Sequence, residues 1–267
     1  MSMYIGVFRL RFIYALQYRA AALAGVSTQF AWGFMEIFAF DAFYKSNPAA
    51  FPMEFSHTVS YIWIQQAFLA LFMLWFWEGD ISDAIVGGQI SYELVRPMDL
   101  YGRWFCQAVA NRTARAALRC SPILLVAAFL PEPYGLKPPP GLTELMLFVV
   151  SGALALGVVV AFGMLMYISL FYTISSLGVR AIVSTLSDFL SGAIIPLPFF
   201  PPRVLAVVGL LPFASMQNMP LRIYSGDIAG ADAYRGILLQ FAWLAALIAV
   251  GRLTMRRALG KVVVHGG

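Results

Sequence analysis

Long apolar stretches, separated by short polar ones, run along almost the whole chain. A helix needs about 20 residues to cross a hydrocarbon core of about 30 Å, and several of the stretches reach that length. The third stretch is apolar enough for lipid only after Ala116, and the fifth is too short to cross comfortably on its own. The pattern predicts six membrane-spanning helices, at residues 20–44, 58–77, 104–130, 142–172, 181–195 and 234–253.

Two further segments are partly apolar but do not resemble spans. Residues 1–18 place Ile5, Phe8 and Phe12 at helical spacing among arginines, which is typical of a helix lying in the membrane interface. Residues 196–226 contain several prolines, which break helices. Broken backbone is tolerated at membrane depth only where protein or water covers it, so a re-entrant hairpin on the outer face is predicted there.

Composition supports a membrane protein. Of the 267 residues, 61% are hydrophobic and 12% are charged, and the mean hydropathy is +0.78. Soluble domains carry about 25% charged residues, so a soluble fold is excluded. We expect an all-α integral membrane protein that forms a single domain over residues 1–267.

The 18 basic residues are distributed unevenly between the predicted loops. With the N-terminus inside, thirteen lie at the inner ends of the spans and five lie outside. Loops rich in lysine and arginine stay in the cytoplasm, so both termini are predicted to be cytoplasmic. The net charge of +5 reports this topology, and no nucleic-acid partner is expected. The five outer residues are Lys45, Lys137, Arg203, Arg222 and Arg235.

One polar interruption, residues 78–99, follows the second predicted span. Its charged residues require water. Its first half is predicted to be a short helix that Asp80 caps and that ends at Gly87 and Gly88. Asp83 falls in the first turn, where negative charge suits the helix dipole.

The short helix carries a small apolar face. Ile81, Ala84 and Ile85 fall on one side of it and have no core of their own to fill. Residues 90–94 then alternate apolar and polar positions until Pro97 ends the run. We predict that this segment docks into a partner protein on the cytoplasmic side; the alternative is an ordinary loop between two helices.

Two carboxylates lie inside predicted spans. A charged side chain at the bilayer centre costs about 3 kcal/mol, so Glu36 and Asp188 are expected to face protein or a wet cavity. One interpretation is that they line a transport pathway, with Asn111 as a third candidate, and attract cationic or hydrogen-bonding amphiphiles. The other is that they pair with arginine or backbone groups and lock helices together.

Two stretches carry a resemblance to a known family. Gly88–Asp99 is close to the pattern G-x-I-x-x-x-L-x-R-P, and Ser191–Pro202, with Leu211–Phe213 and Pro220–Gly226, is close to a proline-rich pattern. Together with the six predicted spans, they make the chain resemble the permeases of ABC type-2 exporters. More narrowly, it resembles the small stand-alone bacterial half-transporters of the ABC-2 family.

This resemblance implies a half-transporter in the bacterial cytoplasmic (inner) membrane. Two permeases, identical or related, would form the pathway among membrane lipids, and two ABC ATPase subunits would bind below them. Residues 4–18 would match the family's elbow helix, residues 78–86 its coupling helix, and residues 196–226 its outer hairpin. The coupling candidates are Asp80, Ile81, Asp83, Ala84, Ile85 and Arg96, and the outer-gate candidates are Pro196, Phe199 and Phe200.

Two sets of residues each allow two interpretations. The phenylalanine pair of the hairpin either plugs the exit or anchors the outer interface. A stripe of five polar residues recurs every four positions on one face of the helix expected at residues 99–130. It either contacts lipid phosphates or the ATPase, or is a solvated face that follows the positive-inside bias, which we favour. The stripe consists of Arg103, Gln107, Asn111, Arg115 and Arg119.

The sequence lacks the motifs of an enzyme. Residues 255–262 do not form a Walker A motif, because Met255 occupies the position of its first glycine and Val262 the position of its serine or threonine. The only histidines, His57 and His265, lie far apart, so no metal site is expected. We expect no catalysis and no cofactor in this chain, with ATP and magnesium bound by the partner ATPase.

The substrate is not fixed by these patterns. The alternative function is an ion-coupled secondary transporter that uses Glu36 and Asp188 as ion sites. It would need no ATPase.

Overall fold

The computed structural model describes residues 2–173 and 176–261, and all regular secondary structure in these ranges is helical. The all-α prediction is therefore confirmed for this part of the chain. Met1 of the predicted interfacial helix, Val262 and His265 lie outside the described residues. The helices are α1 (Ser2–Ala15), α2 (Arg19–Ser46), η1 (Pro48–Ala50), α3 (Phe55–Ala67), α4 (Leu69–Phe72), α5 (Gly79–Val86), α6 (Ile90–Leu94), α7 (Leu100–Phe129), α8 (Leu142–Ser169), α9 (Ser176–Leu190), η2 (Leu197–Phe199), α10 (Pro202–Val208), α11 (Asn218–Ser225) and α12 (Gly230–Leu259).

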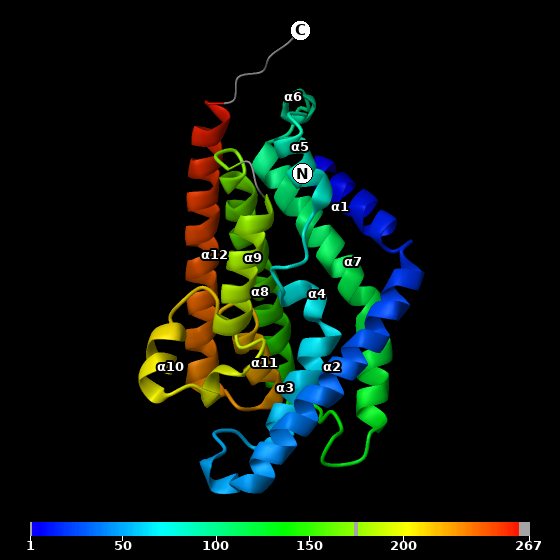
Figure 1. Ribbon diagram of the computed structural model, residues 1–267, viewed down its shortest axis with the longest axis vertical. Coiled ribbons are helices and arrows are strands. Elements are labelled where there is room, and N and C mark those ends of the chain that lie inside the picture. Colours follow the sequence, from blue (N-terminus) through cyan, green and yellow to red (C-terminus); the bar gives the residue numbers. More distant parts are fainter. Residues whose placement is uncertain (1, 174–175, 262–267) are drawn as a thin grey trace.

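The long helices run between the two ends of an elongated molecule (Figure 1). Helices α5 and α6, the start of α1 and the last turns of α12 lie at one end, and the turns that follow α2 and α7 lie at the other. Helix α8 packs along α12 and against α11, whereas α7 packs against α1, α2 and α3. The predicted coupling segment therefore lies at the same end as the start of α1 and the end of α12.

Two helices, α8 and α12, are long and apolar enough to cross a membrane by length and composition. They approach closely because Gly157 has no side chain: a Cβ there would lie 2.9 Å from Leu244 Cδ1. A buried polar contact also joins them, since Ser151 Oγ donates to Gln240 Oε1 over 2.8 Å. Gln240 Nε2 in turn donates to the backbone oxygen of Ser215 over 2.9 Å, which ties the chain before α11 to the same pair.

The second apolar segment, expected at 58–77 as one helix, is broken in the structure. It forms α3 and the short α4, and the chain then runs without helical structure up to α5. A broken helix leaves carbonyl groups without partners, and these groups must be satisfied where they are buried. The Arg112 guanidinium does this: it donates to the oxygens of Ala70, Met73 and Phe76 over 3.1, 2.7 and 2.9 Å.

The proline-rich segment after α9 is held by α3. Helix α9 begins and ends five residues before the predicted segment 181–195, and the chain turns at Gly192, whose φ is +81°. Tyr61 Oη donates to the oxygen of Gly192 over 3.0 Å, and Gln65 Nε2 to that of Ala193 over 2.8 Å. The turn is thus anchored on buried side chains of α3, and the short helices η2, α10 and α11 follow it.

Candidate functional site

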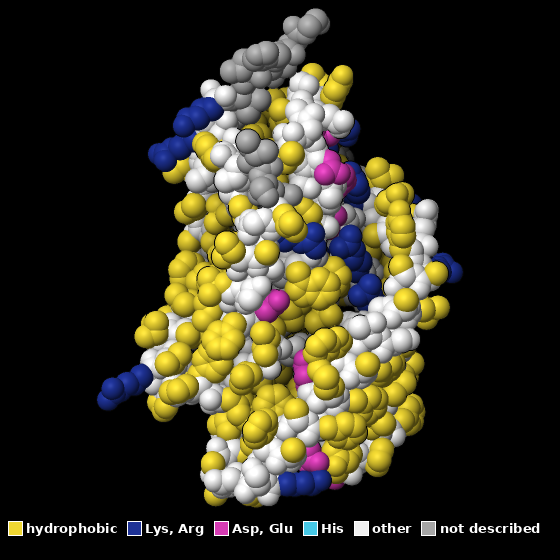
Figure 2. Space-filling view, in the orientation of Figure 1, with side chains coloured by type: hydrophobic (Ala, Val, Ile, Leu, Met, Phe, Trp, Pro, Cys, Tyr) yellow, Lys and Arg dark blue, Asp and Glu magenta, His cyan; other side chains and the backbone are white. Residues whose placement is uncertain are grey.

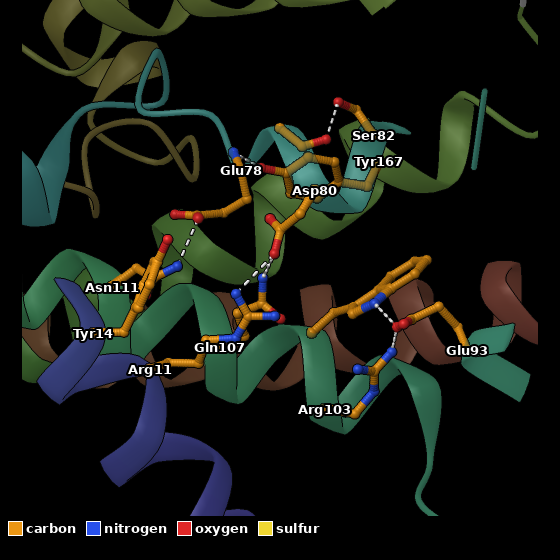
Figure 3. A network of polar contacts seen from close by, with 12 residues as sticks. Arg11, Tyr14, Glu78, Asp80, Ser82, Glu93, Arg103, Gln107, Asn111 and Tyr167 are labelled. Carbon is orange, nitrogen blue, oxygen red and sulfur yellow. Dashed lines mark hydrogen bonds and ion pairs between the residues drawn. The ribbon is translucent and has the colours of Figure 1, made fainter. Parts of the chain in front are cut away.

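Helix α5 forms where the sequence predicts a short helix, but its first turn is held differently. Glu78 occupies the N-cap position without a side-chain cap bond, so the prediction that Asp80 caps the helix is wrong. The Asp80 carboxylate instead accepts from Arg11 Nη1 and from Gln107 Nε2, both over 2.8 Å (Figure 3). These donors belong to α1 and α7, so Asp80 joins three helices. Gly87 and Gly88, the latter with φ of +70°, close α5 as predicted.

The apolar face of α5 fills a core within this chain. Ile81 and Ala84 are buried, and Ile85 is half-buried against the same cluster. That cluster includes Trp104 of α7 and Tyr167 of α8. The expectation that this face has no core of its own is therefore wrong: α7, α8 and the end of α12 supply one.

The segment after α5 is helical rather than an alternating extended run. Helix α6 buries Ile90 and directs Glu93 toward α7, where the carboxylate pairs with the buried Arg103. Trp104 Nε1 donates to the same carboxylate over 3.2 Å, and Arg96 approaches it from outside over 3.7 Å. Glu93 thereby fixes α6 to the first turns of α7 (Figure 3).

Glu78 is the most deeply buried member of this group, at 5% exposure. Asn111 Nδ2 donates to Glu78 Oε2 over 2.6 Å, and Arg115 Nη2 lies 3.9 Å from Oε1. The Glu78 backbone N–H donates to the Tyr167 hydroxyl over 2.7 Å. Desolvating a carboxylate is costly, and a structure keeps it buried only when such partners surround it.

These contacts define a network that we call the coupling network. It joins Glu78, Asp80 and Glu93 to the polar stripe of α7 and to α1. Arg103, Gln107 and Asn111 are each no more than 7% exposed, so the favoured prediction of a solvated stripe is wrong. The polar stripe of α7 therefore supplies hydrogen-bond and ion-pair partners for the acidic segment. The network consists of Arg11, Glu78, Asp80, Glu93, Arg103, Gln107, Asn111 and Arg115.

The exposed part of α5 and α6 differs from the predicted docking face. Asp83 and Arg96, two of the coupling candidates, are exposed as a docking role requires. The large apolar side chains exposed beside them are Val86, Tyr92, Leu94 and Val95, at 51%, 74%, 43% and 82%. The alternation marked Ile90, Tyr92 and Leu94 as apolar positions but did not show that Ile90 is buried and the other two are exposed, because the sequence did not show which side of each short helix faces α7.

Glu36 of α2 and Asp188 of α9 lie in the wall of the same cavity. Both line a cavity of about 410 Å³ that α3, α4 and α7 complete. Among the described residues neither carboxylate has an ion pair, and Asp188 Oδ1 is buried without a hydrogen-bond partner. Asn111, the third pathway candidate, lies instead in the coupling network.

The outer-gate candidates lie beside a second cavity. Phe199 packs against Phe40 and Phe51, with ring centroids 4.9 and 4.8 Å apart. Phe200 packs on Phe189 of α9 at 5.2 Å, and Pro196 is buried. Of the three, only Phe199 lines the large apolar cavity, of about 790 Å³, that also reaches Glu36.

Sequence reasoning missed two arginines of this region. Arg11 was assigned to an interfacial helix, and Arg112 only to the positive inner side, yet Arg11 binds Asp80 of α5 and Arg112 holds the segment between α4 and α5. The signal available was an arginine directly beside Asn111 in an alanine-rich helix, where few other side chains could carry a specific contact. Among residues 2–173 and 176–261, no three histidine, cysteine or acidic side chains are grouped as metal ligands.

The geometry describes an all-helical membrane protein whose acidic segment is rigidly attached at one end. A search of curated proteins found no match. Residues 30–266, most of the chain, match the family described as ABC-2 family transporter protein. The resemblance predicted from the two motifs is confirmed, and the chain belongs to the ABC-2 transporter family, whose members are the membrane permeases of ABC transporters.

Proposed function

We propose that this chain is the membrane subunit of an ATP-driven exporter in a bacterial cytoplasmic membrane. Six segments would cross the bilayer, carried by α2, α3 with α4, α7, α8, α9 and α12, with both termini in the cytoplasm. Two permeases, identical or related, would enclose the pathway. Two ATPase subunits would bind the ATP and magnesium. Family membership supports this arrangement, as does the position of α1, α5, α6 and the end of α12 at one end of the molecule.

The observation that carries the proposal is the coupling network. ATP-driven closure of the ATPases would push on α5 and α6. Glu78 and Glu93 bind buried side chains of α7, and Asp80 binds α7 and α1 at a more exposed position, so these elements would move as one body. Hydrogen bonds to charged groups contribute about 1.5–3 kcal/mol each, so several together resist sliding of α5 over α7.

Exposed residues of α5, of α6 and of the turn after α6 would form the surface that meets the ATPase. We call Asp83, Val86, Tyr92, Val95 and Arg96 the docking tip. It combines an aromatic ring and an arginine, which dominate the energetics of many interfaces, with exposed aliphatic side chains. The buried Ile81 and Ala84 would transmit force rather than touch the ATPase.

Co-purification tests this proposal. A tagged chain is extracted from its native membrane, and the bound ATPase is identified by mass spectrometry and quantified. We expect Tyr92→Ala to reduce the recovered ATPase at least about tenfold, the effect of losing about 1.4 kcal/mol at an interface hot spot. The matched control is Tyr172→Ala, because Tyr172 is 56% exposed and lies near the end of α12, with Lys261 Nζ 5.5 Å from its ring centre.

The variants test the docking tip, and the wild-type chain tests the exporter. Equal recovery with Tyr92→Ala and Tyr172→Ala would contradict the docking tip. A wild-type chain that brings no ATPase out of the membrane would contradict the exporter and favour the secondary transporter.

A further inference from the structure

The cavity of Glu36 and Asp188 adjoins the large apolar cavity beside Phe199. The two share Trp32, Glu36, Ala193 and Ile194 in their walls. Their volumes are about 410 and 790 Å³, so together they have room for a small organic molecule. Figure 2 shows a hollow beside α2 that contains charged side chains and is bordered by hydrophobic ones.

The walls change in chemistry along α2. At the end near α1, Gly25 gives room to the Arg119 guanidinium, and a Cβ there would lie 2.7 Å from Arg119 Cζ. Glu36 follows eleven residues later, about 16 Å along the helix at 1.5 Å per residue. Beyond Glu36 the wall is formed mainly by apolar side chains, including Phe40 and Phe43. The cavities thus offer a charged region at one end and an apolar region at the other.

The charged region favours a cation. It contains two carboxylates and one guanidinium, and that guanidinium is engaged over the Phe76 ring, 5.9 Å from its centre. Asp188 Oδ1 and the side-chain oxygen of Gln29, a residue only 3% exposed, are both buried without hydrogen-bond donors, and Arg119 Nε is a buried donor without an acceptor. Buried acceptors without donors are costly, and a positive charge beside them would offset this cost electrostatically, even where the cation carries no N–H.

Trp32 adds a second cation-binding element. It lines both cavities at their junction, one helical turn before Glu36. Aromatic faces attract organic cations, and quaternary ammonium groups in particular. A carboxylate beside an aromatic ring therefore suits a cationic head, while the Phe40 and Phe199 side takes an apolar tail.

We infer that these joined cavities bind an amphipathic organic cation, with its charged group between Glu36 and Asp188 and its apolar part against Phe40 and Phe199. The inference deepens the proposed export function and rests on it for one point only, that the bound cation is the cargo. Binding itself needs no ATPase, so it is tested separately.

The test uses the purified full-length chain in nanodiscs of zwitterionic lipid, with radiolabelled dodecyltrimethylammonium as the probe. We expect saturable binding that Glu36→Gln and Asp188→Asn each weaken about tenfold, as expected for the loss of a charged partner. The matched control is Glu132→Gln, because the Glu132 side chain is 83% exposed in the loop after α7. Phe199→Ala should also weaken binding, by about threefold to tenfold, through lost apolar contact.

Competition on the wild-type chain tests charge and tail without any substitution. We expect dodecyl sulfate, which has the same tail and opposite charge, and tetramethylammonium, which has the charge without the tail, to displace the probe poorly. Absence of saturable binding, unchanged affinity in both acid variants, or equal displacement by dodecyl sulfate would overturn the inference. Equal displacement by tetramethylammonium would overturn the assignment of the apolar cavity. Cation binding by a chain that recruits no ATPase would support this inference and contradict the proposed function.

Discussion

Asn111 of α7 donates a hydrogen bond of 2.6 Å to Glu78, the residue directly before α5. Both side chains are buried, at 7% and 5% exposure, so the contact is shielded from water. The backbone of Glu78 is bonded to Tyr167 of α8 as well. The start of α5 is therefore fixed to two long helices, and a displacement of α5 must either move them or break buried polar contacts.

Substituting Asn111 tests this attachment. Asn111→Leu removes the donor and leaves the Glu78 carboxylate with Arg115, 3.9 Å away, as its remaining side-chain partner. We expect a loss of about 1–3 kcal/mol, the cost of an unsatisfied buried acceptor, measured as thermal unfolding of the purified chain. Asn47→Leu, at an exposed position after α2, is the control and should change stability little.

Arg112 is predicted to be irreplaceable by lysine. Its guanidinium satisfies three buried carbonyl oxygens at once, and a lysine ammonium lacks the planar fork that reaches them. We expect Arg112→Lys to destabilise the chain by about 3 kcal/mol or more and to reduce the folded fraction recovered by size-exclusion chromatography. Arg115→Lys is the control, since the Arg115 side chain is one-third exposed and makes only a long ion pair with Glu78 and a cation–π contact with Phe76. Similar losses in both variants would show that the broken segment does not depend on the fork.

The contact between α8 and α12 is tested at two glycines of the same helix. A leucine at position 157 would collide with Leu244, whereas a Cβ at Gly152 meets no atom within 4 Å. We expect Gly157→Leu to destabilise the chain by about 1–3 kcal/mol through overpacking, and Gly152→Leu to be tolerated. Thermal unfolding of both variants in the same nanodiscs provides the comparison. Equal stability would mean that α8 and α12 do not pack through Gly157.

Much of the fold could be predicted because membrane helices are marked by length and hydropathy. Helix α2 coincides with the apolar segment at 20–44 within two residues at each end, and α5 ends at its glycines. The break after α4 was not predictable in this way. It depends on Arg112, which lies 36 to 42 residues after the carbonyl groups that it binds.

The sequence predicted the separate segments of the site but not the contacts between them. The acidic segment and the polar stripe of α7 were both visible in the sequence. Hydropathy could not show that Glu78 faces Asn111 or that Ile81 faces a core, because both contacts join distant segments. Glu36 and Asp188 were recognised as unusual, and the turn at Gly192 helps to bring Ala193 and Ile194 into the same cavity wall.

The proposed coupling requires that the docking tip lie on the cytoplasmic side and be covered by an ATPase. The test uses Val86→Cys in a chain whose two free cysteines, Cys106 and Cys120, are replaced by serine. Val86 is 51% exposed, so a cysteine there is open to reagent. Asn47→Cys, exposed after α2 at the opposite end of the molecule, is the control for the outer side.

A membrane-impermeant thiol reagent is then applied to inside-out and right-side-out vesicles, with and without the ATPase partner. We predict that the cysteine at position 86 reacts only in inside-out vesicles and is protected when the ATPase is bound, while the cysteine at position 47 shows the opposite sidedness and no protection. Labelling of position 86 from the outside, or labelling that the ATPase leaves unchanged, would contradict the account.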